Sequence, residues 1–478
     1  MKSVETKNKF SKVLGTTDVM MVAFGAMIGW GWVVSSGQWI QQGGVVGTAI
    51  GFIIGGIMIY FVGLCYAELT ASMPICGSTH AFSYKAFGSV GSFVCTWAII
   101  LSYIGVVCFE AVSLPTILQY IFPGFLKGYL YTVAGFDIYA SWLITAIFFA
   151  ILITVINIVG TKKAAMLQNV LTVIIAVVGI ILVVASLFSG DASNMENQMF
   201  KGDSNGKILE TIVAVAITTP FFFFGFDVIP QAAEEINVPL KKVGRLMMLS
   251  IVLAVVFYVM IVHSVGYIMS ASDIAVSMKT SGLVTADAMA KAFSSTTMAK
   301  VLIIGGLCGI VTSWNSFMIG GSRALYAMAE SYMIPHSFSK LGKKGTPINA
   351  LLLVGLLSVV APFFGRVMLT WIVDASNFAC CLAYCIVSIS FIVIRKKEPE
   401  LNRPYKVKHY WSVGIIAVLM AGAMAMMYII PGTVCTLIWQ EWIIVGGWAV
   451  LGLLFGVCSK LRYKTKFASN VVKTELLD

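Results

Sequence analysis

The sequence predicts an all-α integral membrane protein with about twelve transmembrane helices. Hydrophobic residues make up 59% of the 478 residues and charged residues only 11%, which is more apolar surface than a soluble core can bury. Apolar stretches long enough to cross a bilayer recur along the whole chain. Basic residues gather on alternate connections between these stretches, as expected when cytoplasmic loops carry most of the Lys and Arg.

The expected spans are bounded by the polar residues between them. They cover residues 17–37, 45–67, 92–122, 138–157, 165–188, 209–230, 246–269, 298–328, 349–364, 368–394, 411–431 and 438–458. We expect a tail at 1–16, a first group of five spans at 17–188, a second group of five at 209–394, a final pair at 411–458 and a tail at 459–478. The polar N-terminus, with no small-residue cleavage pattern after the first apolar run, favours a retained first helix.

The charge distribution predicts the orientation. The net charge is +11, and an arrangement with both termini in the cytoplasm places most basic residues on that side. These are Lys2, Lys7, Lys9, Lys12, Lys85, Lys162, Lys163, Lys241, Lys242, Arg245, Lys340, Lys343, Lys344, the segment "RKKEPELNRPYKVK", Lys460, Arg462, Lys464 and Lys466. The opposite side receives Lys127, Lys201, Lys207, Lys279, Lys291, Lys300 and Arg366. This pattern indicates a cell-membrane protein and excludes a nucleic-acid-binding role.

Signatures of an enzyme or a metal protein are missing from the sequence. The ten cysteines and four histidines are scattered, mostly in the expected spans, without ligand-like spacing, so buried packing thiols are the favoured interpretation. We find no phosphate loop, HExxH or nucleophile elbow. We therefore expect no enzyme activity, no cofactor and no metal. Of the longer loops, 270–297 is predicted either as a short amphipathic helix over an entrance or as a passive linker.

The first span is interrupted by glycine. The segment "GAMIGWGWV" at 25–33 holds three glycines in seven residues. A backbone group freed in hydrocarbon costs several kcal/mol unless protein, water or a ligand pairs with it. A binding site is one interpretation of the break, and close helix packing through the Gly25/Gly29 spacing is the other.

A second interruption lies in the sixth span, "IVAVAITTPFFFFGFDVIPQAAEEINVP". It contains Gly225 between Pro220 and Pro230, and an acid, Asp227, at membrane depth, each of which is costly there. Breaks five spans apart are typical of an inverted-repeat transporter whose site lies between the two halves. A half-helix starting at Gly29–Gly31 would present N–H groups to an anion, and freed carbonyls at 23–26 and 224–225 would accept from an ammonium. The pattern predicts a site for a zwitterion.

Five ordered motifs carry a resemblance to a known family. They are "GAMIGWGWVVSSG", "YAELTASMPICGSTHAFSYKAFG" at 66–88, "FFFFGFDVIPQAAEEINVPLKKVGR", "SRALYAMAESYMIPHSFSKLGKKGTPINA" and "IRKKEPELNRPYKV". The chain resembles the amino acid-polyamine-organocation transporters over most of its length. The resemblance implies a LeuT-like five-plus-five inverted repeat with broken helices 1 and 6. Met27 and Trp30 depart from the family's usual first-helix pattern.

The resemblance also implies site residues. Backbone N–H groups of Ile28, Gly29 and Gly31 would bind the substrate carboxylate, and carbonyls of Ala23, Phe24 and Phe224 would accept from its amine. Aromatic gates fall at Phe224, Phe226 and Phe317, although the "FFFF" run at 221–224 also fits apolar packing. Pocket-lining side chains fall at Leu101, Ser102 and Ser376.

Glu110 is an acid within the third expected span. Members that carry cationic amino acids tend to have a glutamate near Ser102, and Glu110 lies eight residues further on, roughly two and a quarter helical turns. It is expected to pair with an amine, to carry a proton, or only to hydrogen-bond a neighbouring helix. Asp374 is expected to be a surface or helix-capping acid.

The driving force is left with three alternatives. Some proton-linked members have a lysine in the fifth helix at the position of Ile175, where this chain has none. Sodium held by first-helix carbonyls with Thr312 and Ser313, proton coupling through Glu110, and exchange of amino acids without an ion all remain. The predicted function is a permease that moves an amino acid or related amine by alternating access. The alternative is a substrate-gated channel or a transporter-like membrane sensor.

Overall fold

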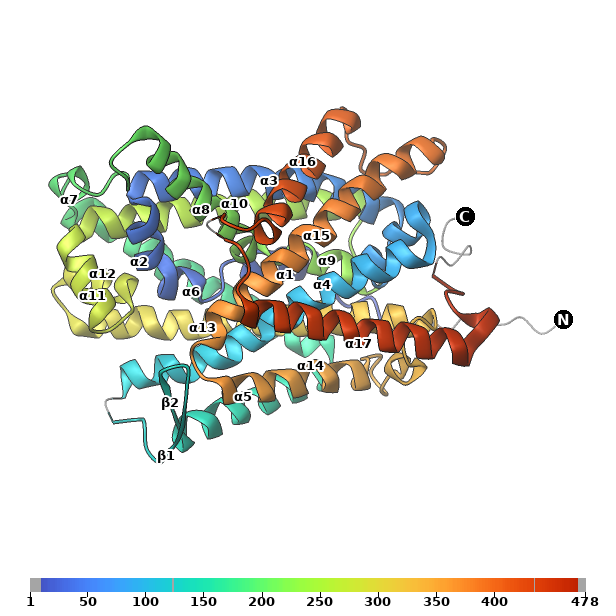
Figure 1. Cartoon of the computed structure of the whole chain (residues 1–478), viewed down its shortest axis with the longest axis horizontal. Helices are drawn as coiled ribbons and strands as arrows, with labels where there is room; N and C mark the ends of the chain where they lie inside the picture. The colour runs from blue at the N-terminus through green and yellow to red at the C-terminus, as the bar shows by residue number, and fades with distance from the viewer. Residues whose placement is uncertain (1–9, 123, 434, 472–478) are drawn as a thin grey trace.

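The chain folds into a bundle of long helices whose axes run roughly along one direction (Figure 1). The computed structural model describes residues 10–122, 124–433 and 435–471. The long helices are α1 (Thr16–Met27), α2 (Gly31–Gly43), α3 (Val45–Ser72), α4 (Ser78–Ile121), α5 (Ala140–Val159), α6 (Thr161–Ser189), α8 (Asn205–Phe223), α10 (Leu240–Ile268), α13 (Thr296–Glu330), α14 (Ile348–Val360), α15 (Met368–Lys397), α16 (Tyr410–Ile429) and α17 (Trp439–Tyr463). The shorter ones are α7 (Ser193–Glu196), α9 (Val228–Gln231), α11 (Ala271–Lys279) and α12 (Val284–Phe293).

The all-α membrane prediction is confirmed. Within the described ranges, eleven helical segments are long and apolar enough to cross a bilayer, with α1–α2 and α8–α9 each counted as one. The span expected at 349–364 is a shorter apolar helix, α14 followed by the 3-10 turn Ala361–Phe364. The third span was predicted to begin at residue 92, which is too late. The helix α4 begins at Ser78 and bends at Gly88, where φ is 72°.

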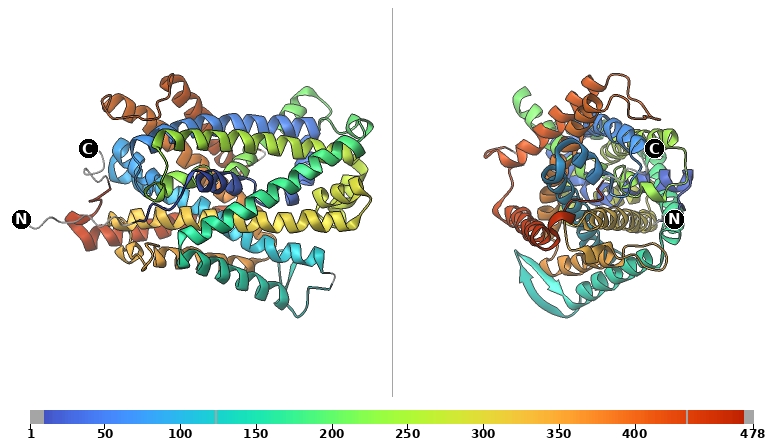
Figure 2. Two further views of the ribbon diagram at one scale, coloured as in Figure 1. Left: turned by 180° about the vertical axis from the view of Figure 1, so that it is seen from behind. Right: turned by 90° about the vertical axis from the view of Figure 1, so that its right-hand side faces the viewer.

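Burial separates the central helices from the peripheral ones. In α4 and in the α8–α9 segment, 89% of the most apolar 18-residue stretch is buried, against 11% in α17. α4 and α8 therefore form the middle of the bundle, and α17 covers its side. The end-on view in Figure 2 shows α16 and α17 at the rim. α4 packs against α13 and α15, and α1 packs against α6, α10 and α13. The two broken segments therefore lie inside protein, as free backbone groups require.

One end of the bundle carries a hairpin that the sequence analysis did not predict; we call it the hairpin end. β1 (Tyr129–Val133) pairs antiparallel with β2 (Phe136–Tyr139). The turn residues Ala134 and Gly135 have φ of 48° and 83°, the positive values that a tight two-residue hairpin needs. The alternating aromatic and β-branched residues in "YLYTVAGFDIY" were the available signal. α11 and α12 lie at the same end. Their presence confirms the helical structure that was one of the two predictions for the 270–297 loop.

The opposite end, which we call the basic end, holds both described chain ends and several ion pairs. Val13 and Leu14 donate their N–H groups to the Glu235 carbonyl at 2.9 and 3.0 Å, so the described part of the expected 1–16 tail is packed. The Ala468 N–H donates to the Ser331 carbonyl at 2.9 Å. Lys2, Lys7, Lys9 and residues 472–478 of the expected tails lie outside the described residues.

At the basic end, a buried ion pair joins Arg323 of α13 to Glu235. The Arg323 guanidinium in α13 donates to the Glu235 carboxylate at 2.8 Å and to the Thr161 hydroxyl at 2.8 Å. The side chains of Arg323 and Glu235 are only 1% and 4% exposed, so losing one partner would leave an unpaired buried charge.

We expect Arg323→Met to lower the free energy of unfolding by about 3 kcal/mol or more, because Glu235 then keeps a buried charge without its cation. The measurement is thermal unfolding of purified protein in detergent, followed by tryptophan fluorescence. The matched control is Arg323→Met combined with Glu235→Met, which should recover most of the loss. Equal stability of wild type and Arg323→Met would show that the pair contributes nothing to the fold.

Candidate functional site

The first helix is broken where the glycines predicted a break. α1 ends at Met27 and α2 begins at Gly31, leaving Ile28, Gly29 and Trp30 between them. In the part of the chain that the structure describes, the N–H groups of Gly29, Trp30 and Gly31 make no hydrogen bond. A helix N-terminus with free N–H groups carries a partial positive charge, so these three N–H groups are unpaired donors in the middle of the bundle.

The carbonyl side of the break is partly occupied. The Phe24 carbonyl accepts the Ile28 N–H at 3.0 Å, while Ala23 lies inside α1. The next carbonyls bind hydroxyls: Gly25 accepts from Thr312 at 3.0 Å and Met27 from Tyr258 at 2.8 Å. Each carbonyl oxygen has a second lone pair, so an ammonium could still bind there.

The second break meets the first. α8 ends at Phe223 and α9 begins at Val228, and Gly225 between them has φ of 132°. A Cβ on Gly225 would stand 3.1 Å from the Met27 nitrogen, so only glycine allows the two breaks to approach. Asp227 supports this turn: its carboxylate accepts the Gly225 N–H at 3.0 Å and the Tyr103 hydroxyl at 2.7 Å. This membrane-depth acid therefore holds the break open.

Glu110 lies beside the first break. The Ser313 hydroxyl of α13 donates to the Glu110 Oε1 in α4, and Oε2 has no hydrogen-bond partner among the described residues. A Cβ added to Gly29 would stand 2.8 Å from the Ser313 Oγ and 3.2 Å from the Glu110 Oε1. The predicted row of N–H groups at Gly29–Gly31, which we call the clamp, therefore lies beside two of the predicted coupling residues, Glu110 and Ser313.

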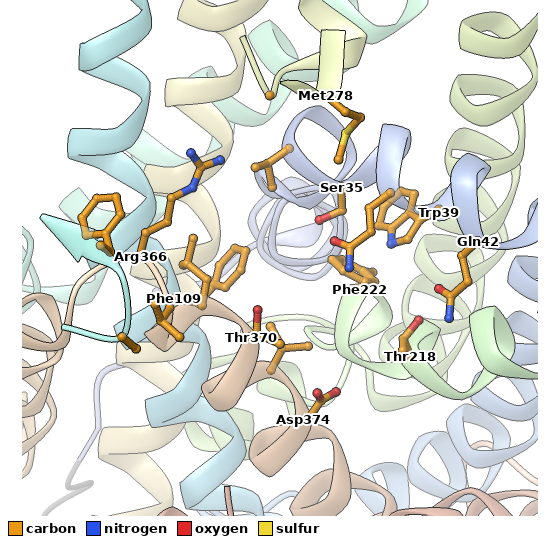
Figure 3. A pocket seen from close by; sticks show the side chains of 18 of the residues that line it. Ser35, Trp39, Gln42, Phe109, Thr218, Phe222, Met278, Arg366, Thr370 and Asp374 are labelled. Carbon is orange, nitrogen blue, oxygen red and sulfur yellow. The ribbon is translucent and has the colours of Figure 1, made fainter. Parts of the chain in front are cut away.

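A cavity of about 850 Å³ lies at the hairpin end of the bundle (Figure 3). Its wall includes Trp39, Phe109 and Phe222, together with the hairpin tip and the α11–α12 turn. Phe222 closes the path to the clamp, since a Cβ on Gly31 would lie 2.6 Å from its ring carbon Cε1. The sequence analysis did not single out Phe222, because within "FFFF" nothing distinguishes one ring from the next.

The predicted aromatic gates lie elsewhere. Phe224 packs on Phe221 and Tyr384, with ring centroids 5.5 and 6.2 Å apart. Phe226 packs on Tyr66 at 5.6 Å and Phe317 on Tyr103 at 5.7 Å. All three are buried, and none lines the cavity. Their role as gates stays a prediction.

The remaining predicted residues are buried where α4 meets α15. Leu101 and Ser102 lie in α4, and the Ser102 hydroxyl donates to the Ser376 carbonyl in α15 at 2.9 Å. The Ser376 hydroxyl has no hydrogen-bond partner among the described residues. The hydroxyl packs against Gly105 of α4, where an added Cβ would overlap the Ser376 Oγ, and Ser376 is not among the residues that line the cavity. Its pocket-lining role stays a prediction.

Asp374, expected to be a surface or helix-capping acid, lies in the cavity wall rather than at a helix end. It is half-buried on α15, lines the cavity and hydrogen-bonds to Glu441. The acid that caps a helix is Glu441, which accepts the Ile438 N–H at 2.9 Å at the start of α17. The sequence could not show that these two carboxyl groups, 67 residues apart, meet.

Comparison with known proteins now identifies the family. A sequence profile described as amino acid permease matches residues 14–455. The chain belongs to the amino acid permease family. The match confirms the resemblance on which the site residues were predicted. The permease is therefore a multi-pass membrane transporter.

Individual relatives are distant and cover nearly all of the permease. A methylthioribose transporter of Bacillus subtilis is 25% identical and covers 93% of this chain and 94% of its own length. The branched-chain amino acid permease BcaP of the same organism is 25% identical, with 84% of each chain covered. The histidine permease HisP of Lactococcus lactis is 23% identical, with 99% of each chain covered.

Proposed function

We propose that the permease binds the carboxylate of an α-amino acid on the free N–H groups at Gly29–Gly31 and its ammonium on the carbonyls around the two breaks. The observation that carries this proposal is the unpaired N–H row, which lies below the Phe222 ring at the base of the cavity. An ionised carboxylate suits such donors better than a neutral group does. Transport then needs no charged side chain to hold the substrate backbone.

The proposal includes a direction of access. The cavity extends from the hairpin end to Phe222, which separates it from the clamp, and the basic end is closed by the Arg323–Glu235 pair and by Leu14, whose carbonyl accepts the Asn237 N–H at 2.8 Å. Because Lys and Arg concentrate on the cytoplasmic side, the hairpin end faces outward and both termini lie inside. In the alternating-access cycle, Phe222 covers the loaded clamp and these basic-end contacts then separate.

The substrate side chain is selected by other groups. The named relatives differ in what their names specify, namely methylthioribose, branched-chain amino acids and histidine, so family membership does not choose the substrate. Phe224 lies in the second break and packs on Phe221, and the Ser376 hydroxyl is unpaired among the described residues. These groups favour a small or apolar side chain with at most one polar atom.

The test is a thermal-shift screen of purified permease against single amino acids, amines and methylthioribose. A substrate at 100 times its Kd should stabilise the folded state by about 2.7 kcal/mol. The hit is then tested in proteoliposomes, where we expect saturable uptake and acceleration by unlabelled substrate inside. Flux that never saturates would favour a channel, and a hit that binds without being taken up would favour a sensor.

A further inference from the structure

Arg366 is an unpaired cation in the outer cavity. It follows Gly365, whose φ of 72° turns the chain between the 3-10 turn at Ala361–Phe364 and α15. Its guanidinium lines the cavity and reaches the α11–α12 turn, where a Cβ on Gly282 would stand 3.5 Å from Nη2 (Figure 3). Within the described ranges it makes neither an ion pair nor a hydrogen bond.

The desolvation of this guanidinium has a cost. Burial lowers the pKa of Arg366 from its usual value, which means that the surroundings disfavour the charge. A partly buried cation without a partner is destabilising. Such a group is retained at lowest cost where an anion binds it for part of the working cycle.

The neighbouring acids are already engaged. Asp287 of α12 accepts from the Ser277 hydroxyl at 2.5 Å and from the Tyr120 hydroxyl at 2.9 Å, which fixes the α11–α12 turn. Asp374 is hydrogen-bonded to Glu441. The guanidinium donors of Arg366 therefore face the cavity rather than a carboxylate of the chain.

We propose that Arg366 forms an outer binding site for the carboxylate of the incoming substrate, separate from the clamp at Gly29–Gly31 and reached before it. This proposal rests on the proposed function, since it takes the substrate to be an amino acid. Guanidinium binds a carboxylate through two parallel hydrogen bonds. A volume of about 850 Å³ admits an amino acid with any side chain, so this site recognises the backbone carboxylate alone.

The outer site has a defined place in the path. Phe222 separates the cavity from Gly31, so a ligand held on Arg366 waits above the ring until the ring moves. The amide side chains of Gln38 and Gln42, which also line the cavity, offer carbonyl oxygens to the ammonium. Amines without a carboxylate would gain nothing from Arg366 and would be captured less well.

The experiment uses full-length protein in detergent in which the clamp is blocked by Gly31→Val. The probes are L-leucine, 4-methylpentanoate, which lacks the amine, and L-leucinamide, which lacks the carboxylate. We expect the Gly31→Val protein to bind L-leucine and 4-methylpentanoate but not L-leucinamide. Adding Arg366→Gln should weaken binding of both carboxylates by about tenfold or more, and Arg366→Lys should weaken it less.

The matched control is Lys279→Gln, which removes an exposed cation from the wall of the same cavity and should leave binding to the Gly31→Val protein unchanged. Equal affinities with and without Arg366→Gln would overturn the proposal, as would a Gly31→Val protein that binds neither carboxylate. Because binding is measured without transport, a wild type that binds at Arg366 yet takes up no amino acid would refute the proposed function alone.

Discussion

Gly31→Val and Gly29→Val should each abolish uptake while the protein still inserts into the membrane. A Cβ at Gly31 meets the Phe222 ring at 2.6 Å, and one at Gly29 meets the Ser313 Oγ at 2.8 Å, so each added side chain displaces a group that packs against the segment with the free N–H groups. Losing charge-assisted hydrogen bonds to a carboxylate costs about 3 kcal/mol, roughly a hundredfold in affinity. The measurements are substrate affinity at the clamp and uptake into proteoliposomes.

Two controls separate lost binding from lost folding. Gly447→Val places the same side chain on α17, where a Cβ meets no atom within 4 Å, and should leave uptake at the wild-type rate. Gly31→Ala combined with Phe222→Leu relieves the clash with the ring, so a loss due only to packing would be repaired. We expect this double variant to stay impaired, and normal uptake by it, or by both valine variants, would contradict the clamp.

The sequence predicted what depends on local composition. Apolar length predicted the spans, and glycine with proline and acid in single spans predicted both broken helices, which the structure contains at 28–30 and 224–227. These features are local, because the residues that free backbone groups in a membrane helix lie within the segment that they interrupt. Ordered motifs predicted the family, which the profile match confirms.

Contacts between distant segments were beyond the reach of local pattern. Glu110 and Ser313 were both singled out, but their hydrogen bond joins residues 203 positions apart, and no periodicity relates them. Phe222 and Phe224 cannot be told apart in the sequence, and they differ only in their surroundings: Phe222 lines the cavity, whereas Phe224 packs on other aromatic rings. Arg366 appeared only as one of several outer charges, since its burial without a partner depends on how α12 and α15 fold around it. The equivalence of the two five-span groups as inverted repeats stays a prediction.

The contact between Glu110 and the clamp makes Glu110 the residue we expect to couple transport to protons. The groups beside it are the Ser313 hydroxyl from α13 and the Gly29 backbone between α1 and α2. No basic side chain contacts it among the described residues. A carboxyl group in such surroundings can exchange a proton while keeping its hydrogen bond to Ser313, so protonation can follow the arrival of the substrate carboxylate beside it.

Glu110→Gln keeps the shape of the side chain and removes its titration. With an inward proton gradient we expect wild-type uptake to be stimulated and the Glu110→Gln variant to lose that stimulation, together with the pH dependence of uptake. The other acid at the breaks, Asp227, is held by the Gly225 N–H and the Tyr103 hydroxyl. Exchange of internal for external substrate needs no net proton movement and should continue in the variant. The assay is uptake into proteoliposomes under a proton gradient, a sodium gradient or internal substrate alone.

The three alternatives for the driving force give different results in this assay. Sodium stimulation that disappears in Ser313→Ala would assign the oxygen cluster of Gly25, Thr312 and Ser313 to a cation, since hard cations bind oxygen ligands, and would refute proton coupling. Exchange alone, with neither gradient effective, would make Glu110 a purely structural partner of Ser313. The control is Ser113→Ala, which removes a buried hydroxyl of α4 that bonds only within its own helix, to the Phe109 carbonyl at 2.8 Å. This variant should leave uptake unchanged under all three conditions. Proton-driven uptake that survives Glu110→Gln would contradict the assignment directly.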